Sequence, residues 1–169
     1  MKRLGIFFFY EKNGDVDDFI TYYLADLHKN LTELVVVCNG KLSAQGRAAF
    51  EQFTDTIIVR ENKGLDVWAY KTALDFYGWE KLSEYDEIVM TNSTLMGPVR
   101  PLREMFEAMW ENQDLDFWGL PYTTAQSRTP SRASIFTTIC RCISSPILSS
   151  TASALCRIRS CRPIGIRCR

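Results

Sequence analysis

The 169-residue sequence predicts an α/β fold: an open, doubly wound and mostly parallel sheet with helices on its faces. The first observation is a series of short, nearly continuous apolar runs, which are typical of strands buried on both faces. The second is that a segment with helical apolar spacing follows each run, which implies right-handed crossovers between parallel strands. The third is a hydrophobic content of 46%, enough for the core of one ordinary domain.

Each predicted element has its own sequence basis. Strands are placed on apolar runs, and helices where apolar residues recur every three or four positions. Gly14 and Asp15 provide a turn and an N-cap ahead of the first helix, and Asn39 with Gly40 closes the second strand. Pro101 suits the first turn of the last helix. In chain order the elements are strand 4–10, helix 16–29, strand 34–38, helix 43–53, strand 56–60, helix 65–77, strand 87–91, helix 101–109 and strand 116–120.

The formal net charge of zero conceals two different parts of the chain. Residues 1–126 hold all 20 acidic residues and 12 of the 20 basic ones, whereas residues 127–169 hold eight Arg, no acid and five of the six Cys. The irregular Cys spacing does not match common zinc sites, and an Arg-rich tail suits polyanions, including anionic lipid surfaces. We favour a shift of reading frame near codons 123–130. We therefore expect a domain over 1–122 and a poorly ordered tail over 123–169.

The chain's start and its sparse His and Cys residues bear on location and on chemistry. The apolar run after Met1 is too short for a signal peptide, and no stretch is long enough to span a membrane. We expect a cytoplasmic protein. His28 is the only histidine, which disfavours His-based catalysis, and Cys38 is expected to be a core residue.

In such sheets ligands bind beyond the carboxyl ends of the strands, so the residues that follow each strand are the candidate site. Tyr10 follows the first strand and suits a nucleobase or a sugar. Lys63, Gly64 and Asp66 precede the helix after the third strand, where free N–H groups suit phosphate and Lys71 adds charge. The plainer interpretation, a solvated loop and an Asp that only complements the helix dipole, remains open.

The end of the fourth strand lacks a feature that nucleotide-dependent transferases use. These enzymes commonly need a carboxylate there to hold Mg²⁺ or Mn²⁺ against a diphosphate, and residues 91–98 contain none. Asp114 and Asp116 precede the apolar run of the fifth strand, and they suit either metal binding or a structural role where the strand begins. Trp118 is either a wall for a sugar ring or a core residue.

Several segments resemble the rhamnan synthesis protein F family of bacterial polysaccharide enzymes, rhamnosyltransferase-like proteins of the GT-A type. The resemblance covers about residues 1–122, and its more specific segments are 61–71, 92–98 and 116–119. It implies that Asn62, Gly64 and Asp66 face a donor nucleotide, and that Asn92, Ser93, Thr94 and Gly97 border it. Ser93 stands where the family usually has Asp, which counts against the Mg²⁺ or Mn²⁺ that the resemblance implies.

The resemblance implies transfer of a deoxyhexose, rhamnose, from a nucleoside-diphosphate sugar such as dTDP-rhamnose to a growing cell-surface glycan or lipid-linked glycan. It implies no nucleic-acid partner and leaves peripheral contact with the inner face of the membrane open. Asp116 is a weak candidate for the catalytic residue. The alternative is an inactive, truncated donor-binding fragment of such an enzyme.

Overall fold

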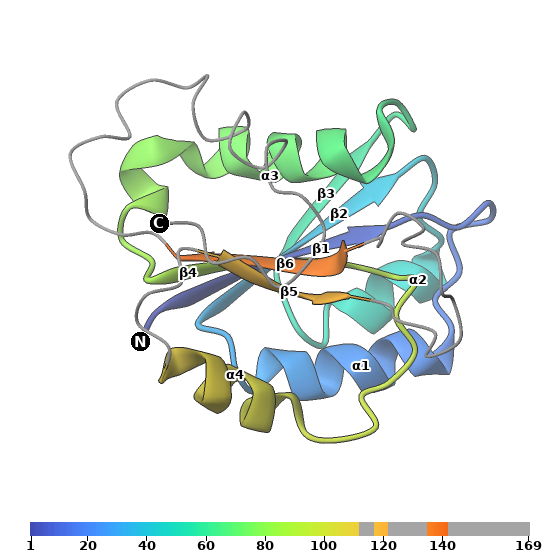
Figure 1. The fold of residues 1–169 in the computed structure, drawn as a ribbon. Coiled ribbons are helices and arrows are strands. Elements are labelled where there is room, and N and C mark those ends of the chain that lie inside the picture. The colour runs from blue at the N-terminus through green and yellow to red at the C-terminus, as the bar shows by residue number, and fades with distance from the viewer. Residues whose placement is uncertain (112–116, 122–134, 142–169) are drawn as a thin grey trace, which may run out of the picture.

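The computed structural model describes residues 1–111, 117–121 and 135–141. A six-stranded sheet in the order β3-β2-β1-β4-β6-β5 runs through the molecule, with α3 on one face and α1, α2 and α4 on the other (Figure 1). The α/β prediction is therefore confirmed. The elements are β1 Arg3–Phe9, α1 Asp18–His28, β2 Glu33–Asn39, α2 Ala44–Phe50, β3 Thr56–Arg60, α3 Leu65–Leu82, β4 Glu87–Asn92, α4 Leu102–Trp110, β5 Phe117–Pro121 and β6 Ile135–Arg141.

The four strands β3, β2, β1 and β4 are parallel and form the frame of the molecule. Because strand side chains alternate between faces, Phe7 and Phe9 enter the core beneath the sheet, while Leu4 and Ile6 pack against α3. This two-sided burial explains why the strands read as continuous apolar runs. The register aligns the ends of β1, β2, β3 and β4, so the residues that close them meet at one edge of the sheet. We call it the carboxyl edge.

The sheet contains a strand that the sequence analysis did not predict. β6 runs antiparallel between β4 and β5, with Glu87 opposite Arg141 and Trp118 opposite Ile139. The segment 135–141 therefore belongs to the sheet, although the boundary was expected at 122. Its β-branched and aromatic residues suit a strand. The run is short, however, and the many Arg, Ser and Cys residues around it suggested a tail instead. The expectation for 142–169 lies outside the described residues.

The helices begin or end at other residues than predicted. The N-cap position of α1 is held by Asp17 rather than Asp15, without a capping hydrogen bond from its side chain, and Pro101 is at the N-cap position of α4 rather than in its first turn. α3 continues past 77 because a kink at Gly78, with φ of 69° and ψ of 159°, joins a short second piece to the first. Within the described part of the chain, no helix is long and apolar enough to cross a membrane.

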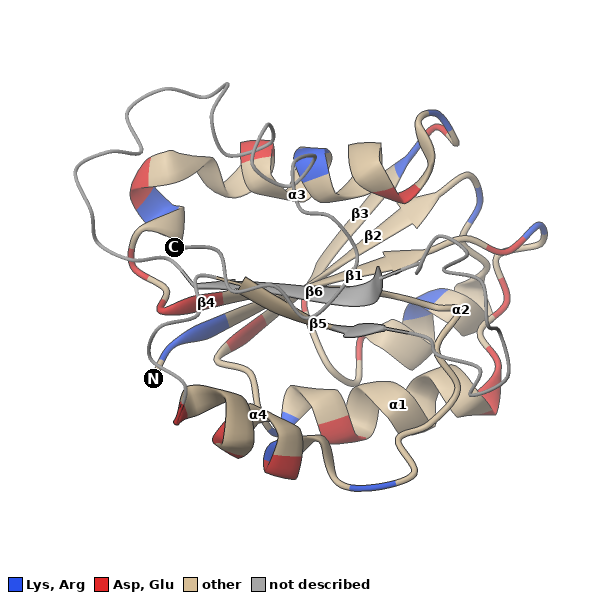
Figure 2. Cartoon of the chain, in the orientation of Figure 1, with Lys and Arg blue, Asp and Glu red and all other residues tan. Residues whose placement is uncertain are grey.

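The charged residues of the central strands gather at their amino ends, while the middle of the sheet is uncharged (Figure 2). Glu87 is almost fully buried, and its Oε2 lies 2.6 Å from Nε of Arg3. The Arg3 guanidinium also lies 4.5 Å from the centre of the Phe106 ring. Glu33 accepts hydrogen bonds from the hydroxyls of Tyr77 and Tyr85. These contacts stabilise the amino edge and leave the carboxyl edge to other residues.

Candidate functional site at the carboxyl edge

A network of polar side chains joins the ends of β2 and β3 to the start of α3. Asn39, fully buried at the end of β2, donates from Nδ2 to Oδ1 of Asn62 and to the carbonyl of Leu65. Its Oδ1 accepts from Nη1 of Arg60 at 2.6 Å, and Nη2 of Arg60 donates to the carbonyl of Lys63. Because these bonds tie strand ends to the loop, the network fixes the path of residues 60–65.

The loop between β3 and α3 turns sharply before the helix begins. Gly64, the N-cap of α3, has φ of 70°, a left-handed conformation that glycine adopts without the steric cost other residues meet. Leu65 also has a positive φ, 55°. In the first helical turn, Oδ1 of Asp66 accepts from the backbone N–H of Val67. The predicted donor-facing segment is thus held in one defined conformation at the carboxyl edge.

Three residues from separate loops form an exposed shelf beside this network. A Cβ placed on Gly40, whose φ is 86°, would lie 3.8 Å from Cε2 of Tyr10 and 4.0 Å from Cβ of Asn62. Tyr10, Gly40 and Asn62 are therefore neighbours, and about half of the Tyr10 side chain is exposed. Such an aromatic face next to open backbone suits stacking by a planar ring.

The end of β4 forms the second half of the candidate site. The Tyr70 hydroxyl, from α3, donates to the carbonyl of Thr91 at 3.0 Å and also bonds the side chain of Asn92. Oδ1 of Asn92 accepts from both the backbone N–H and the hydroxyl of Thr94. Burial, helped by the nearby charge of Asp66, raises the pKa of Tyr70 well above its ordinary value, so the hydroxyl stays protonated.

This end of β4 does not fit a divalent cation of the kind the resemblance implies. Magnesium and manganese prefer carboxylate and carbonyl oxygens with free lone pairs. Asn92 already uses Oδ1 twice as an acceptor, Tyr70 is neutral, and Ser93 supplies a hydroxyl where a carboxylate was expected. Across residues 1–111, 117–121 and 135–141, no three His, Cys, Asp or Glu side chains are placed to hold a metal.

One predicted site residue, Trp118, lies away from the carboxyl edge. Trp118 is only 7% exposed and packs edge-on against Phe106, with ring centres 5.9 Å apart, so it is a core residue and not a sugar-facing wall. Asp116 lies outside the described residues. The strand after it starts at Phe117, which pairs through Cys140 with Ile88 near the beginning of β4. β5 therefore starts at the edge opposite the candidate site.

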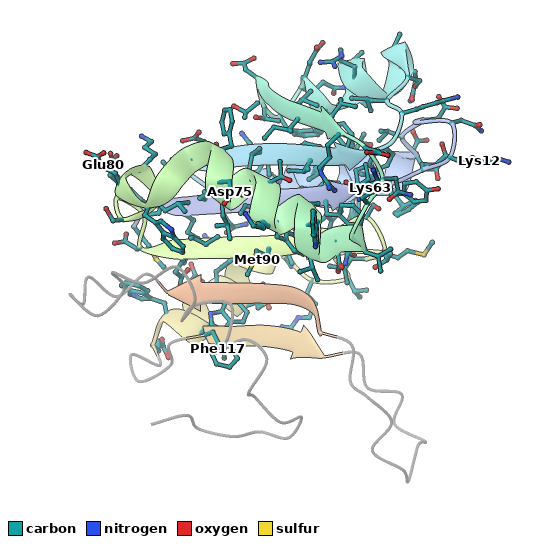
Figure 3. The ribbon with its side chains drawn as sticks, turned by 90° about the horizontal axis from the view of Figure 1, so that it is seen from above. Lys12, Lys63, Asp75, Glu80, Met90 and Phe117 are labelled. Carbon is teal, nitrogen blue, oxygen red and sulfur yellow. The ribbon has the colours of Figure 1, made fainter. Side chains whose placement is uncertain are left out.

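The basic residues predicted for the site have partners of their own. Lys63 and Lys12 lie at the carboxyl edge, at the same end of the molecule, while Asp75 and Glu80 follow farther along α3 (Figure 3). Nζ of Lys63 is 2.8 Å from Glu61, and Lys71 pairs with Asp75. Lys71 is thus turned along the helix and not brought into the network.

The loop after β1 is ordered by a carboxylate. Oε2 of Glu11 accepts from the backbone N–H groups of Asn13, Gly14 and Asp15. Desolvation opposes the effect, but these bonds hold the pKa of Glu11 below its ordinary value. The Glu11 carboxylate therefore serves to hold this loop in place.

A small hollow of about 100 Å³ opens under the loop 95–98, away from the polar network. Apolar groups from α1, α4 and this loop line it, among them Tyr23, Leu95, Gly97 and Phe106. It is smaller than the roughly 300–1,000 Å³ typical of ligand pockets. The carboxyl edge, which is open to solvent, is the better candidate site.

Three residues of the site were missed by the sequence analysis. Asn39 was interpreted only as the close of a strand, Arg60 as the last residue of the next strand, and Tyr70 as part of the apolar side of a helix. Asn39 and Arg60 offered a signal, since each is a polar residue at the exact end of an apolar run. Tyr70 offered none, because its role depends on how α3 lies over β4.

The fold is of the class found in nucleotide-diphospho-sugar transferases. A structure described as a "putative nucleotide-diphospho-sugar transferase" from Desulfovibrio desulfuricans superposes with a TM-score of 0.50 at 15% identity, covering 83% of this chain and 64% of the other. Glucosyl-3-phosphoglycerate synthase from Mycobacterium tuberculosis gives 0.46 at 14% identity, covering 69% and 43%. A second structure of that enzyme, with Mg²⁺ and uridine diphosphate, gives 0.46 at 14% identity, covering 69% and 42%.

The sequence itself identifies the family. Residues 34–141 match the family described as rhamnan synthesis protein F, and the chain belongs to that family. The match continues through β6 and so agrees with the sheet rather than with a boundary at 122. The sequence matches no curated protein. The chain spans less than two thirds of the length of each structural relative described above.

Proposed function

We propose that this chain carries the donor-binding part of a glycosyltransferase that takes a deoxyhexose, rhamnose, from a nucleoside-diphosphate sugar. The acceptor in this proposal is a growing cell-surface glycan or a lipid-linked glycan, reached at the inner face of the membrane. Family membership supports the general class of activity. The observation that carries the proposal is the network of Asn39, Arg60 and Asn62, which orders the loops at the edge where ligands bind such sheets.

Each part of the edge has a task in this proposal. The nucleobase stacks on Tyr10 above Gly40, and Asn62 bonds its edge. Asp66 accepts a hydrogen bond from a hydroxyl of the ribose or of the sugar. Its Oδ2 is used for this, because Oδ1 already accepts from the backbone N–H of Val67. The start of α3 and the end of β4 face the diphosphate. Holding the donor in one geometry lowers the entropy cost of bringing the anomeric carbon to an acceptor.

Thermal stabilisation by dTDP or dTDP-rhamnose tests donor binding, since a ligand that binds only the folded state raises the melting temperature. We expect the shift to fall in Tyr10→Ala and Asn62→Ala, whose side chains are exposed and not needed for the core. Tyr22→Ala is the matched control, because Tyr22 is also exposed but lies on α1. The absence of any shift with dTDP, UDP or their sugar conjugates contradicts the proposal.

A second candidate is a donor-binding fragment without catalysis. The observation that favours it is that Ser93 stands where an Asp was expected and that, among the described residues, no three His, Cys, Asp or Glu side chains could hold a metal together. Under this alternative, nucleotides stabilise the protein, but dTDP-rhamnose is neither hydrolysed nor transferred to any glycan acceptor. Release of dTDP in the presence of acceptor distinguishes the two.

A further inference from the structure

The end of β4 carries a neutral amide and a hydroxyl where a metal-dependent transferase commonly carries a carboxylate. Oδ1 of the buried Asn92 accepts twice from Thr94, so its Nδ2 amide group is the part that donates to the Tyr70 hydroxyl. That amide has two hydrogens, and the second is the one available to a ligand. The Ser93 hydroxyl is half-buried, and no hydrogen bond of it is recorded among the described residues, while its backbone N–H donates to the carbonyl of Phe8. Such neutral groups can donate hydrogen bonds to an anion, whereas they bring no negative charge to hold a divalent cation.

The carboxylate of Asp66, which acts on Tyr70, does not make this point a cation site. Asp66 lies close enough to Tyr70 to raise its pKa, but one oxygen of Asp66 is occupied by the backbone of Val67. A single half-engaged carboxylate leaves a divalent cation dependent on water and phosphate for all its remaining ligands. Each such cation normally takes six or more.

We propose that this chain binds the diphosphate of its donor directly, through the Ser93 hydroxyl, the Asn92 amide and the start of α3, and without a divalent cation. The inference rests on the proposed function, because it concerns the same site and the same ligand class. It makes a separate prediction: the nucleoside diphosphate still binds when divalent cations are removed, and adding them does not increase its affinity.

The test compares dTDP with thymidine by isothermal titration calorimetry, in EDTA and then in MnCl2. We expect dTDP to bind more tightly than thymidine in EDTA, and the dTDP affinity to change by less than about twofold with Mn²⁺, or about 0.4 kcal/mol. Water-proton relaxation by Mn²⁺ gives an independent reading, and we expect no enhancement from the wild-type protein.

Two substitutions at Ser93 test the assignment to this residue. Ser93→Ala removes a donor, and we expect dTDP to bind several-fold more weakly in EDTA with the affinity for thymidine unchanged. Ser93→Asp adds the missing acceptor, and we expect dTDP binding to become at least about tenfold tighter with Mn²⁺ than without, or about 1.4 kcal/mol. Ser83→Ala and Ser83→Asp, at the far end of α3, are the matched controls and are expected to behave as the wild type.

Each outcome decides between the two proposals. Wild-type binding of dTDP that requires Mn²⁺ overturns the metal-free inference and leaves the proposed function standing. Equal affinity for dTDP and thymidine also overturns the inference, because the diphosphate is then not recognised. Failure of both ligands to bind under either condition overturns the proposed function itself.

Discussion

Replacing Asn39 with Leu tests the organisation of the carboxyl edge most severely. The leucine is close to asparagine in size and suits a fully buried position at the end of β2, so it changes chemistry more than volume. It removes the acceptor of Arg60 and the donor to Asn62 and to the carbonyl of Leu65. We expect the loop before α3 to lose its fixed path and the donor to lose its binding surface.

The magnitude follows from the three bonds. The bond from Arg60, 2.6 Å long, is charge-assisted and contributes about 1.5–3 kcal/mol, and the two neutral bonds contribute about 1 kcal/mol each at most. The added apolar burial offsets about 1 kcal/mol. A net loss of about 2–4 kcal/mol is expected, out of a total stability on the order of 5–15 kcal/mol. The melting temperature should fall by roughly 5–15 °C.

Urea unfolding followed by circular dichroism measures the loss, and calorimetry with dTDP measures binding below the unfolding transition. Asn30→Leu is the matched control, since Nδ2 of Asn30 makes a single recorded bond, to the carbonyl of Asp26 at the other edge. It should cost about 1 kcal/mol and leave dTDP binding unchanged. If Asn39→Leu costs no more than this control and binds dTDP normally, the network does not organise the site.

Two further predictions concern stability. Arg3→Met removes the guanidinium that lies 2.6 Å from the buried Glu87 carboxylate and should cost about 3–5 kcal/mol in urea unfolding. Lys71→Met breaks only an exposed pair and should cost less than about 1 kcal/mol, so equal costs refute the ranking. Burial raises the pKa of several acidic groups: the Cys38 thiol to about 12, and the tyrosine hydroxyls to values well above 10.0. The unfolded chain therefore releases these protons first, so stability should be constant to about pH 9 and fall as the pH rises further; a constant unfolding midpoint between pH 9 and 11 contradicts this. The tyrosines are Tyr70, Tyr77 and Tyr85.

The parallel half of the fold could be predicted because its signals are local. The strands β1, β2 and β4 are buried on both faces over most of their length and so carry nearly continuous apolar runs, and each helix between the strands has one apolar side. β6 could not be predicted in the same way. Its place depends on antiparallel pairing with β4 and β5, and its seven residues lie in a segment whose composition suggested a tail.

The sequence indicated where the candidate site would lie better than it indicated which side chains would form it. The rule that ligands bind beyond the carboxyl ends of parallel strands placed Tyr10, Asn62, Gly64 and Asn92 at one edge, and the register brings their strand ends to the same level. The roles of Lys71 and Trp118 depend on which way a side chain turns. Sequence spacing does not give that direction, so it left Trp118 open between a sugar-facing wall and the core, and it did not show that Lys71 pairs with Asp75.

Mapping the amide chemical shifts during a titration with dTDP-rhamnose tests the central claim most directly. The account predicts perturbed amides at the carboxyl edge, at Gly40, Gly64 and Ser93, with the amino edge at Lys29 and Glu84 unchanged. The perturbations should persist in EDTA. Perturbations confined to the amino edge or to α4, or none at saturating donor, would contradict the account.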